Sequence, residues 1–216
     1  TTYVGKSGIV NIEKEARMSG HTHDKGVQII TGFLGQTYAQ KFPMALSCRV
    51  CFEQNYNGID GDSASSTELY CIISSLAEIP IRQGLAVTGS VNQKGEIQAI
   101  GGVTQKIEGF FDLCKKRGLT GNQGVLIPVS NVKDLVLKTE VINAVKEGDF
   151  HIYPITHIDE GIELLMNCPA GQKDENGEFP EDSVHGKVYN KLKRFAKLSR
   201  EFESGDGIAV KKIVPR

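Results

Sequence analysis

The sequence lacks the features of a membrane-spanning chain, a disulfide-stapled chain and a strongly charged chain. Among its 216 residues no apolar run approaches the roughly 20 that a spanning helix needs, and we expect no signal peptide. Cysteine is scarce, odd in number at 5 and scattered, which argues against a secreted disulfide framework. Lys and Arg number 25 against 26 Asp and Glu, so no overall field favours nucleic acid or an anionic membrane.

The composition that remains is that of an ordinary folded domain. Hydrophobic residues make up 39% and charged residues 24%, and a chain of this length buries a core without staples. The chain begins with Thr1 rather than Met, so we expect a fragment of something longer. We predict a main domain over residues 1–168, a polar linker over 169–186, and a C-terminal amphipathic helix and tail over 187–216.

Hydrophobic periodicity predicts an α+β fold in which mixed sheets with hairpins are covered by helices. We expect a loop at residues 18–26 and strands at residues 7–16, 27–31, 45–53, 85–91, 96–100, 124–128 and 151–155. We expect helices from Ser63 to just before Pro80, and at residues 103–117, 132–146 with a break, 159–166 and 187–202. Residues 92–95 predict a hairpin turn, and Asp159 is predicted to cap the helix that follows it.

The predicted C-terminal helix is basic but amphipathic. Val188, Leu192, Phe195 and Phe202 lie near helical spacing, and charged residues alternate with this apolar stripe. The pattern favours packing on the domain or on a neighbouring subunit over binding of nucleic acid or another partner.

The most informative segment places Ser63 where a turn containing Gly61 becomes a helix. The unpaired N–H groups of a first helical turn, with the positive end of the helix dipole, stabilise a developing oxyanion. Ser63 is therefore a candidate nucleophile. The alternative is that Asp62 or Ser63 merely caps the helix.

A nucleophilic serine needs a base, and Lys106 is the better candidate than any of the 5 histidines. It lies three residues after Val103 and four before Phe110, inside the apolar stripe of its predicted helix. A lysine that points inward loses hydration, which lowers its pKa toward the range of a general base. The alternative is a lysine whose stem covers the core while its amine reaches water.

Three other patterns do not predict sites. His21 and His23 are separated by one residue, but no nearby Cys or Glu completes a metal ligand set, and we interpret them as part of an exposed loop. Cys48 and Cys51 form a CxxC pair without a second pair, which argues against zinc. Residues 5–7 imitate the end of a phosphate-binding loop, but the opening glycine is absent and a strand is expected to follow.

Three ordered motifs make the chain resemble the Lon protease proteolytic domain, in a form nearest to the B-type Lon proteins. The motifs are GDSAS at 61–65, AVTGS at 86–90 and GGVTQKIE at 101–108, and the candidate serine and lysine are 43 positions apart, as in that family. The resemblance covers roughly residues 25–166 well, the N-terminal strand less well and the tail weakly. Because three motifs occur at fixed spacing, we favour catalytic roles for Ser63 and Lys106. The alternatives, a helix cap at the serine turn and a lysine whose amine reaches water, are disfavoured.

The resemblance implies a peptidase with a Ser-Lys dyad, in which Ser63 is the nucleophile and Lys106 the general base. Thr88 matches the threonine of the family's hairpin motif and would orient the lysine. Asp60 and Asp62 match acidic positions beside the family serine; an ion pair to Lys106 would raise its pKa and hold the dyad inactive.

The backbone N–H groups of Ser63 and Ala64 are our candidates for the oxyanion hole. Lon domains of another type carry histidines on the strand before the serine loop, whereas residues 47–51 here contain none. We expect no cofactor and no metal in this chain, with ATP bound by a separate module.

The resemblance also implies unfolded or peptide substrates, a homo-oligomer in the form of a hexameric ring, a covalently linked ATPase module and a cytoplasmic location. Neither nucleic acid nor a membrane is expected as a partner. The alternative function is a catalytically silent Lon-like module that supports assembly. Such modules typically lack the dyad, so the presence of both Ser63 and Lys106 favours an enzyme.

Overall fold

A three-stranded sheet forms the N-terminal part of the molecule in the computed structural model, which describes residues 1–204. Its strands are β1 (Thr2–Val4), β2 (Gly8–Asn11) and β3 (Leu46–Val50), in the order β1-β3-β2. Strand β3 is antiparallel to β1 and parallel to β2. The strands predicted at 7–16 and 45–53 are therefore present but shorter, because α1 (Ile12–Glu15) interrupts the first and β3 ends at Val50.

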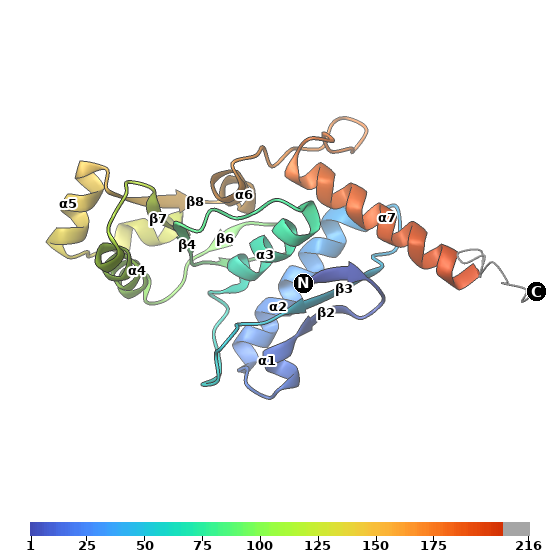
Figure 1. Ribbon diagram of the computed structural model, residues 1–216, viewed down its shortest axis with the longest axis horizontal. Coiled ribbons are helices and arrows are strands. Elements are labelled where there is room, and N and C mark those ends of the chain that lie inside the picture. Colours follow the sequence, from blue (N-terminus) through green and yellow to red (C-terminus); the bar gives the residue numbers. More distant parts are fainter. Residues whose placement is uncertain (205–216) are drawn as a thin grey trace, which may run out of the picture.

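A second sheet is formed by segments that follow α3 (Ser65–Ala77) in the chain, and it consists of parallel strands only. It contains β4 (Leu85–Val87), β7 (Gln123–Pro128) and β8 (Phe150–Ile155), in the order β4-β7-β8. Around it lie α4 (Val103–Arg117), the 3-10 helix η1 (Val129–Asp134), α5 (Thr139–Glu147) and α6 (Ile158–Met166). In Figure 1, α4 and α5 lie at one end of the molecule, and α3 (Ser65–Ala77) lies between them and the N-terminal sheet.

The predicted hairpin is correct only in part. The antiparallel pair is short, β5 (Ser90–Val91) with β6 (Ile97–Gln98), and Thr88 and Gly89 separate it from β4, which joins the parallel sheet instead. The predicted cap of α6 is wrong: His157 occupies the N-cap, and its ring nitrogen accepts a hydrogen bond from the Asp159 N–H.

Residues 21–38 form one long helix, α2 (His21–Tyr38), where we predicted a loop at 18–26 and a strand at 27–31 and left residues 33–42 unassigned. Its buried residues recur every three or four positions: His23, Gly26, Val27, Ile30, Phe33, Leu34 and Tyr38. The β-branched residues at 27–31 favour a strand locally, but burial of this continuous face against the core stabilises the helix.

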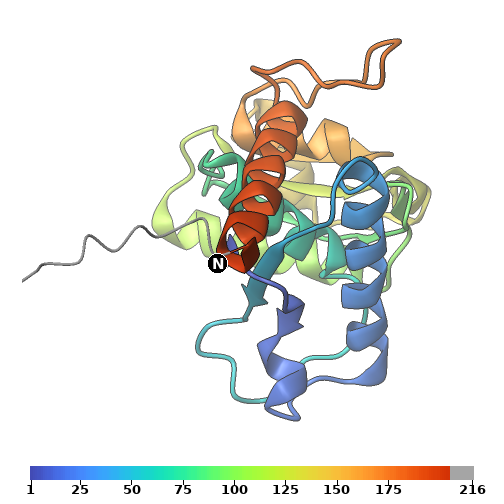
Figure 2. The same ribbon diagram turned by 90° about the vertical axis from the view of Figure 1, so that its right-hand side faces the viewer.

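Two hydrophobic clusters stabilise the fold. The larger joins α2, α3, α6 and the N-terminal sheet, while the smaller joins α4 and α5 to β7 and β8. The last helix, α7 (Val184–Ser204), belongs to the larger cluster through Val188, Leu192 and Phe195. Figure 2 shows α7 running along the outside of the molecule, and its start lies three residues inside the predicted linker.

The division of the chain at residues 168 and 186 stays a prediction, and residues 205–216 of the predicted tail lie outside the described part. Residues 169–183 contain neither helix nor strand. No helix within residues 1–204 combines the length and the apolar character needed to cross a membrane.

Candidate active site

Ser63 lies in the turn immediately before α3, and hydrogen bonds attach this turn to the link between β4 and β5. The Ser63 carbonyl accepts from the Gly89 N–H at 2.9 Å, and the Ser66 hydroxyl donates to the Gly89 carbonyl at 2.7 Å. The Ser65 hydroxyl accepts from the Val91 N–H at 3.2 Å. These bonds fix the position of the turn, because three residues of the stretch 63–66 bind the same neighbouring segment.

Lys106 comes from the first turn of α4, whose position is fixed by a glycine and an asparagine. Gly102, at the N-cap, has φ +68°, a left-handed conformation that residues with a side chain rarely adopt. Just before it, the Ile100 N–H and C=O both bond to the Asn131 side-chain amide at 3.0 Å. This bracing directs the start of α4 toward the serine turn.

The structure brings Ser63, Lys106 and Thr88 together from three separate segments. The Lys106 amine lies 2.8 Å from the Ser63 hydroxyl and 3.2 Å from the Thr88 hydroxyl. Thr88 is 7% exposed, and its N–H bonds to the Leu126 carbonyl of β7. The three side chains line a cavity of about 320 Å³ whose other walls include Phe52, Val87 and Val125.

Burial lowers the pKa of Lys106 below its ordinary value, although the negative charge of Asp62 acts in the opposite direction. The lysine is less enclosed than the stripe predicts. Val103 and Ile107 are buried, whereas Lys106 is exposed at the edge of the helix face. The stem of the lysine crosses this edge so that the amine reaches the cavity.

Asp62 and Asp60 have different surroundings. Asp62 accepts a hydrogen bond from the Ser90 hydroxyl at 2.9 Å, and it makes no ion pair with Lys106. Asp60 does not reach the dyad: its carboxylate accepts from the N–H groups of Gly61 and His23, which lowers its pKa. Asp60 thus stabilises the start of α2.

The helix-cap alternative is wrong for both Asp62 and Ser63. Helix α3 has Ala64 at its N-cap and no side-chain cap. Within residues 1–204, the N–H groups of Ser63 and Ala64 donate to no other protein group. Two free donors at the positive end of a 13-residue helix, next to a serine hydroxyl, match the requirements for binding an oxyanion.

Sequence reasoning missed a buried polar cluster behind the site. Glu13, His23 and Glu68 are 3%, 1% and 3% exposed, and the His23 Nε2 lies 3.5 Å from the Glu68 carboxylate. Burial, with the charge of Glu13, raises the pKa of Glu68 to about 8. The prediction that His23 belongs to an exposed loop is wrong. The helical spacing of His23 with Val27, Ile30 and Leu34 was the available signal.

Cys48 is buried in β3 and Cys51 follows the strand, and both are free thiols. Within the described residues, no three His, Cys, Asp or Glu side chains form a group that could hold a metal ion. The described site thus consists of a hydroxyl, an amine, a second hydroxyl and free backbone donors around one cavity.

Comparison with known proteins finds relatives over most of the chain. Residues 53–167 match the family described as the Lon protease (S16) C-terminal proteolytic domain. A Lon protease homolog of Escherichia coli is 42% identical over 165 residues, covering 76% of this chain and 28% of that protein. An archaeal Lon protease of Thermococcus kodakarensis is 33% identical over 184 residues, covering 79% of this chain and 27% of that protein. The chain therefore spans less than a third of these relatives.

Proposed function

The chain belongs to the family of Lon protease (S16) C-terminal proteolytic domains, and from this premise we propose that it is a serine endopeptidase with a Ser63-Lys106 dyad. The observation that supports the dyad most directly is the 2.8 Å contact between the Lys106 amine and the Ser63 hydroxyl. That distance is within the reach of direct proton transfer.

In the proposed reaction, neutral Lys106 accepts the proton of the Ser63 hydroxyl as its oxygen bonds to the substrate carbonyl carbon. The resulting oxyanion is bound by the N–H groups of Ser63 and Ala64. The protonated lysine then donates to the leaving amine as the peptide C–N bond breaks, which leaves an acyl-enzyme. Water, deprotonated by Lys106, releases the acid product and restores the serine. Thr88 holds the amine in line through its 3.2 Å contact.

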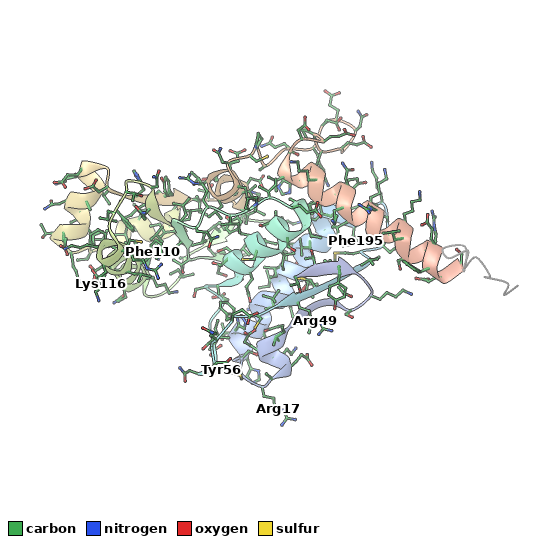
Figure 3. All side chains as sticks on the ribbon, viewed as in Figure 1. Arg17, Arg49, Tyr56, Phe110, Lys116 and Phe195 are labelled. Carbon is green, nitrogen blue, oxygen red and sulfur yellow. The ribbon has the colours of Figure 1, made fainter. Side chains whose placement is uncertain are left out.

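The test replaces each member of the dyad and measures hydrolysis of a fluorogenic peptide and of casein. We expect Ser63→Ala to abolish cleavage, and Lys106→Met to reduce kcat by about 10²–10⁴-fold because an unactivated serine is a poor nucleophile. Lys116→Met is the matched control: Lys116 is exposed at the far end of the same helix (Figure 3). Unimpaired cleavage by Ser63→Ala would remove the assignment.

The pH dependence separates a general base from a merely structural lysine. Activity should rise with pH as Lys106 loses its proton, since only the neutral amine accepts one. The Asp62 charge raises the pKa of Lys106, so Asp62→Asn should move the rising limb of kcat/KM to lower pH. The asparagine carbonyl can still accept from Ser90, so the turn remains bound. If the rising limb of the kcat/KM profile lies at the same pH in Asp62→Asn as in the wild type, the role of Lys106 as the base is contradicted.

The alternative, a silent assembly module, predicts that a fluorophosphonate probe fails to label Ser63. The intact dyad cavity favours the enzyme. We further propose protein or peptide substrates bound as an added strand, a hexameric ring, an ATPase module in the same polypeptide that binds the ATP, and a cytoplasmic location. All of these rest on the family resemblance.

A further inference from the structure

Phe52 lies between two neighbouring cavities. The first is the dyad cavity of about 320 Å³, and the second, of about 520 Å³, lies between the end of β3 and the outer face of α3. Of the described residues, only Phe52 and Thr67 line both. The second cavity extends away from Ser63 along α3, since Thr67 and Cys71 are one helical turn apart.

The two cavities suit consecutive parts of one extended peptide. From the N-cap Ala64 to Cys71 the helix advances by about 10 Å, a length that about three extended residues cover. The dyad cavity has apolar walls from Ala64, Val87 and Val125, and the second has apolar walls from Val50 and Ile72. The dyad cavity is therefore suited to an apolar substrate side chain, whereas the second cavity is also lined by Arg49, Glu53 and Glu68.

Phe52 is held in this position by buried polar groups rather than by strand pairing. It lies beyond the end of β3 at Val50. Its N–H donates to the Glu13 carboxylate at 2.6 Å, and its ring meets the His23 ring edge-on at 5.8 Å between centroids. Glu13 comes from α1 and His23 from α2, and both are at most 3% exposed.

We propose that Phe52 is a specificity-determining residue that separates two side-chain subsites, and that Glu13 is a positioning residue that holds it there. The proposal rests on the peptidase function above and adds the substrate class: peptides with an apolar side chain of limited size at the cleaved bond. The limit is set by the Phe52 ring, which closes the dyad cavity toward the second one.

The experiment measures a preference between two substrates, which a loss of folded protein does not change. The substrates are acetyl-Ala-Ala-X coumarin amides in which X is leucine or the bulkier 2-naphthylalanine. In Phe52→Ala the two cavities join, so we expect the kcat/KM ratio of naphthylalanine to leucine to rise at least tenfold, chiefly through KM. Phe52→Leu, which removes less volume, should give an intermediate ratio and covers a failure of the alanine variant to fold.

The role of Glu13 is tested by a matched pair. Glu13→Gln keeps a carbonyl that accepts from the Phe52 N–H and should retain the wild-type ratio. Glu13→Ala releases Phe52 and should shift the ratio in the direction of Phe52→Ala. The control is Tyr56→Ala in the same connecting segment, since Tyr56 is 82% exposed, lines neither cavity and lies at the edge of the molecule (Figure 3).

A binding measurement distinguishes failure of this proposal from failure of the peptidase assignment. The probes are the acids acetyl-Ala-Ala-leucine and acetyl-Ala-Ala-naphthylalanine, titrated by calorimetry into Ser63→Ala with and without Phe52→Ala. Suppose that the wild type does not cleave peptides, but Phe52→Ala still changes the ratio of the two binding constants. That outcome would overturn only the peptidase assignment. If Phe52→Ala changes neither the kcat/KM ratio nor the ratio of binding constants for the two side chains, the proposed role of Phe52 is wrong. If both Glu13 variants keep the wild-type ratio, the positioning role of Glu13 is wrong.

Discussion

At the scale of single residues, the buried carboxyl of Glu68 carries a free-energy cost that depends on pH. Neither of its oxygens has a hydrogen-bond partner in the described protein, and its pKa is raised from 4.5 to about 8 by burial and by Glu13. The folded protein therefore keeps a proton between these values that the unfolded chain releases. Stability must fall as pH rises from 4.5 to about 8, by on the order of 4 kcal/mol.

We predict that Glu68→Gln raises the Tm relative to the wild type at pH 9 and changes it little at pH 5. The amide stays neutral, so it avoids the cost of an ionised buried carboxylate, and each kcal/mol corresponds to about 2–4 °C in a chain of this length. Differential scanning calorimetry from pH 5 to 9 measures the difference. Glu53→Gln, at an exposed position, is the control. A wild-type-to-variant difference that is constant with pH would contradict the prediction.

At the residue scale, the sequence predicts most where short motifs fix the local geometry. Ser63, Thr88 and Lys106 lie in three short segments, and the structure places the Ser63 and Thr88 hydroxyls within hydrogen-bond distance of the Lys106 amine. The sequence could not show that Asp60 binds the His23 N–H instead of a dyad residue, because that contact depends on where α2 packs. Phe52 was missed for a similar reason: its partners Glu13 and His23 come from separate elements.

At the scale of elements, helix packing depends on the absence of a side chain at one position. Gly161 of α6 faces the buried Tyr70 of α3, and a Cβ at Gly161 would overlap the tyrosine hydroxyl. Gly109 of α4, in contrast, has open space around it. The two helical glycines are thus a matched pair that separates packing from backbone propensity.

We predict that Gly161→Ala destabilises the protein by about 1–3 kcal/mol through overpacking. Gly109→Ala should stabilise it by about 0.5–1 kcal/mol, because alanine is the better helix former. Urea unfolding measures both changes. Adding Tyr70→Phe to Gly161→Ala should recover part of the loss, since the overlapping hydroxyl is removed. Equal effects of the two glycine substitutions would exclude packing at Gly161 as the cause.

Elements were predicted best where periodicity and turn residues agree. Helix α4 ends at Arg117, as its stripe and the following Gly118 indicate. Helix α2 was missed because residues 27–31 have local strand propensity, and only burial of a whole face across 18 residues outweighs it. Strand β4 was assigned to the wrong pair because its partner, β7, lies more than 30 residues later in the chain.

At the scale of the whole molecule, α7 is attached to the domain by a buried polar relay as well as by apolar contacts. The His185 ring accepts from the Tyr38 hydroxyl at 2.5 Å, and its other nitrogen donates to Asp159 at 3.0 Å. Burial acts to raise the pKa of Asp159, but the hydrogen bonds and charges of His185 and His157 lower it overall. The relay joins α2, α6 and α7.

Shortening a side chain on the apolar face of α7 tests whether this helix unfolds separately or together with the rest of the domain. Leu192 is fully buried in the larger hydrophobic cluster, and Phe195 lies on the same helix face (Figure 3). We predict that Leu192→Ala lowers the unfolding free energy by about 2–5 kcal/mol in a single cooperative transition. The exposed neighbour Lys193 provides the control substitution, Lys193→Ala, which should change it by less than about 0.5 kcal/mol.

The same variant connects the helix to the site, because α7 packs against α3 and Ser63 lies in the turn that leads into α3. If α7 unfolded separately, Leu192→Ala would leave the main transition of the domain and its peptidase activity at the same temperature. We instead expect the loss of helical signal and the loss of peptide cleavage to move together to a lower temperature. Circular dichroism and a fluorogenic peptide, followed over one temperature series, distinguish the two cases.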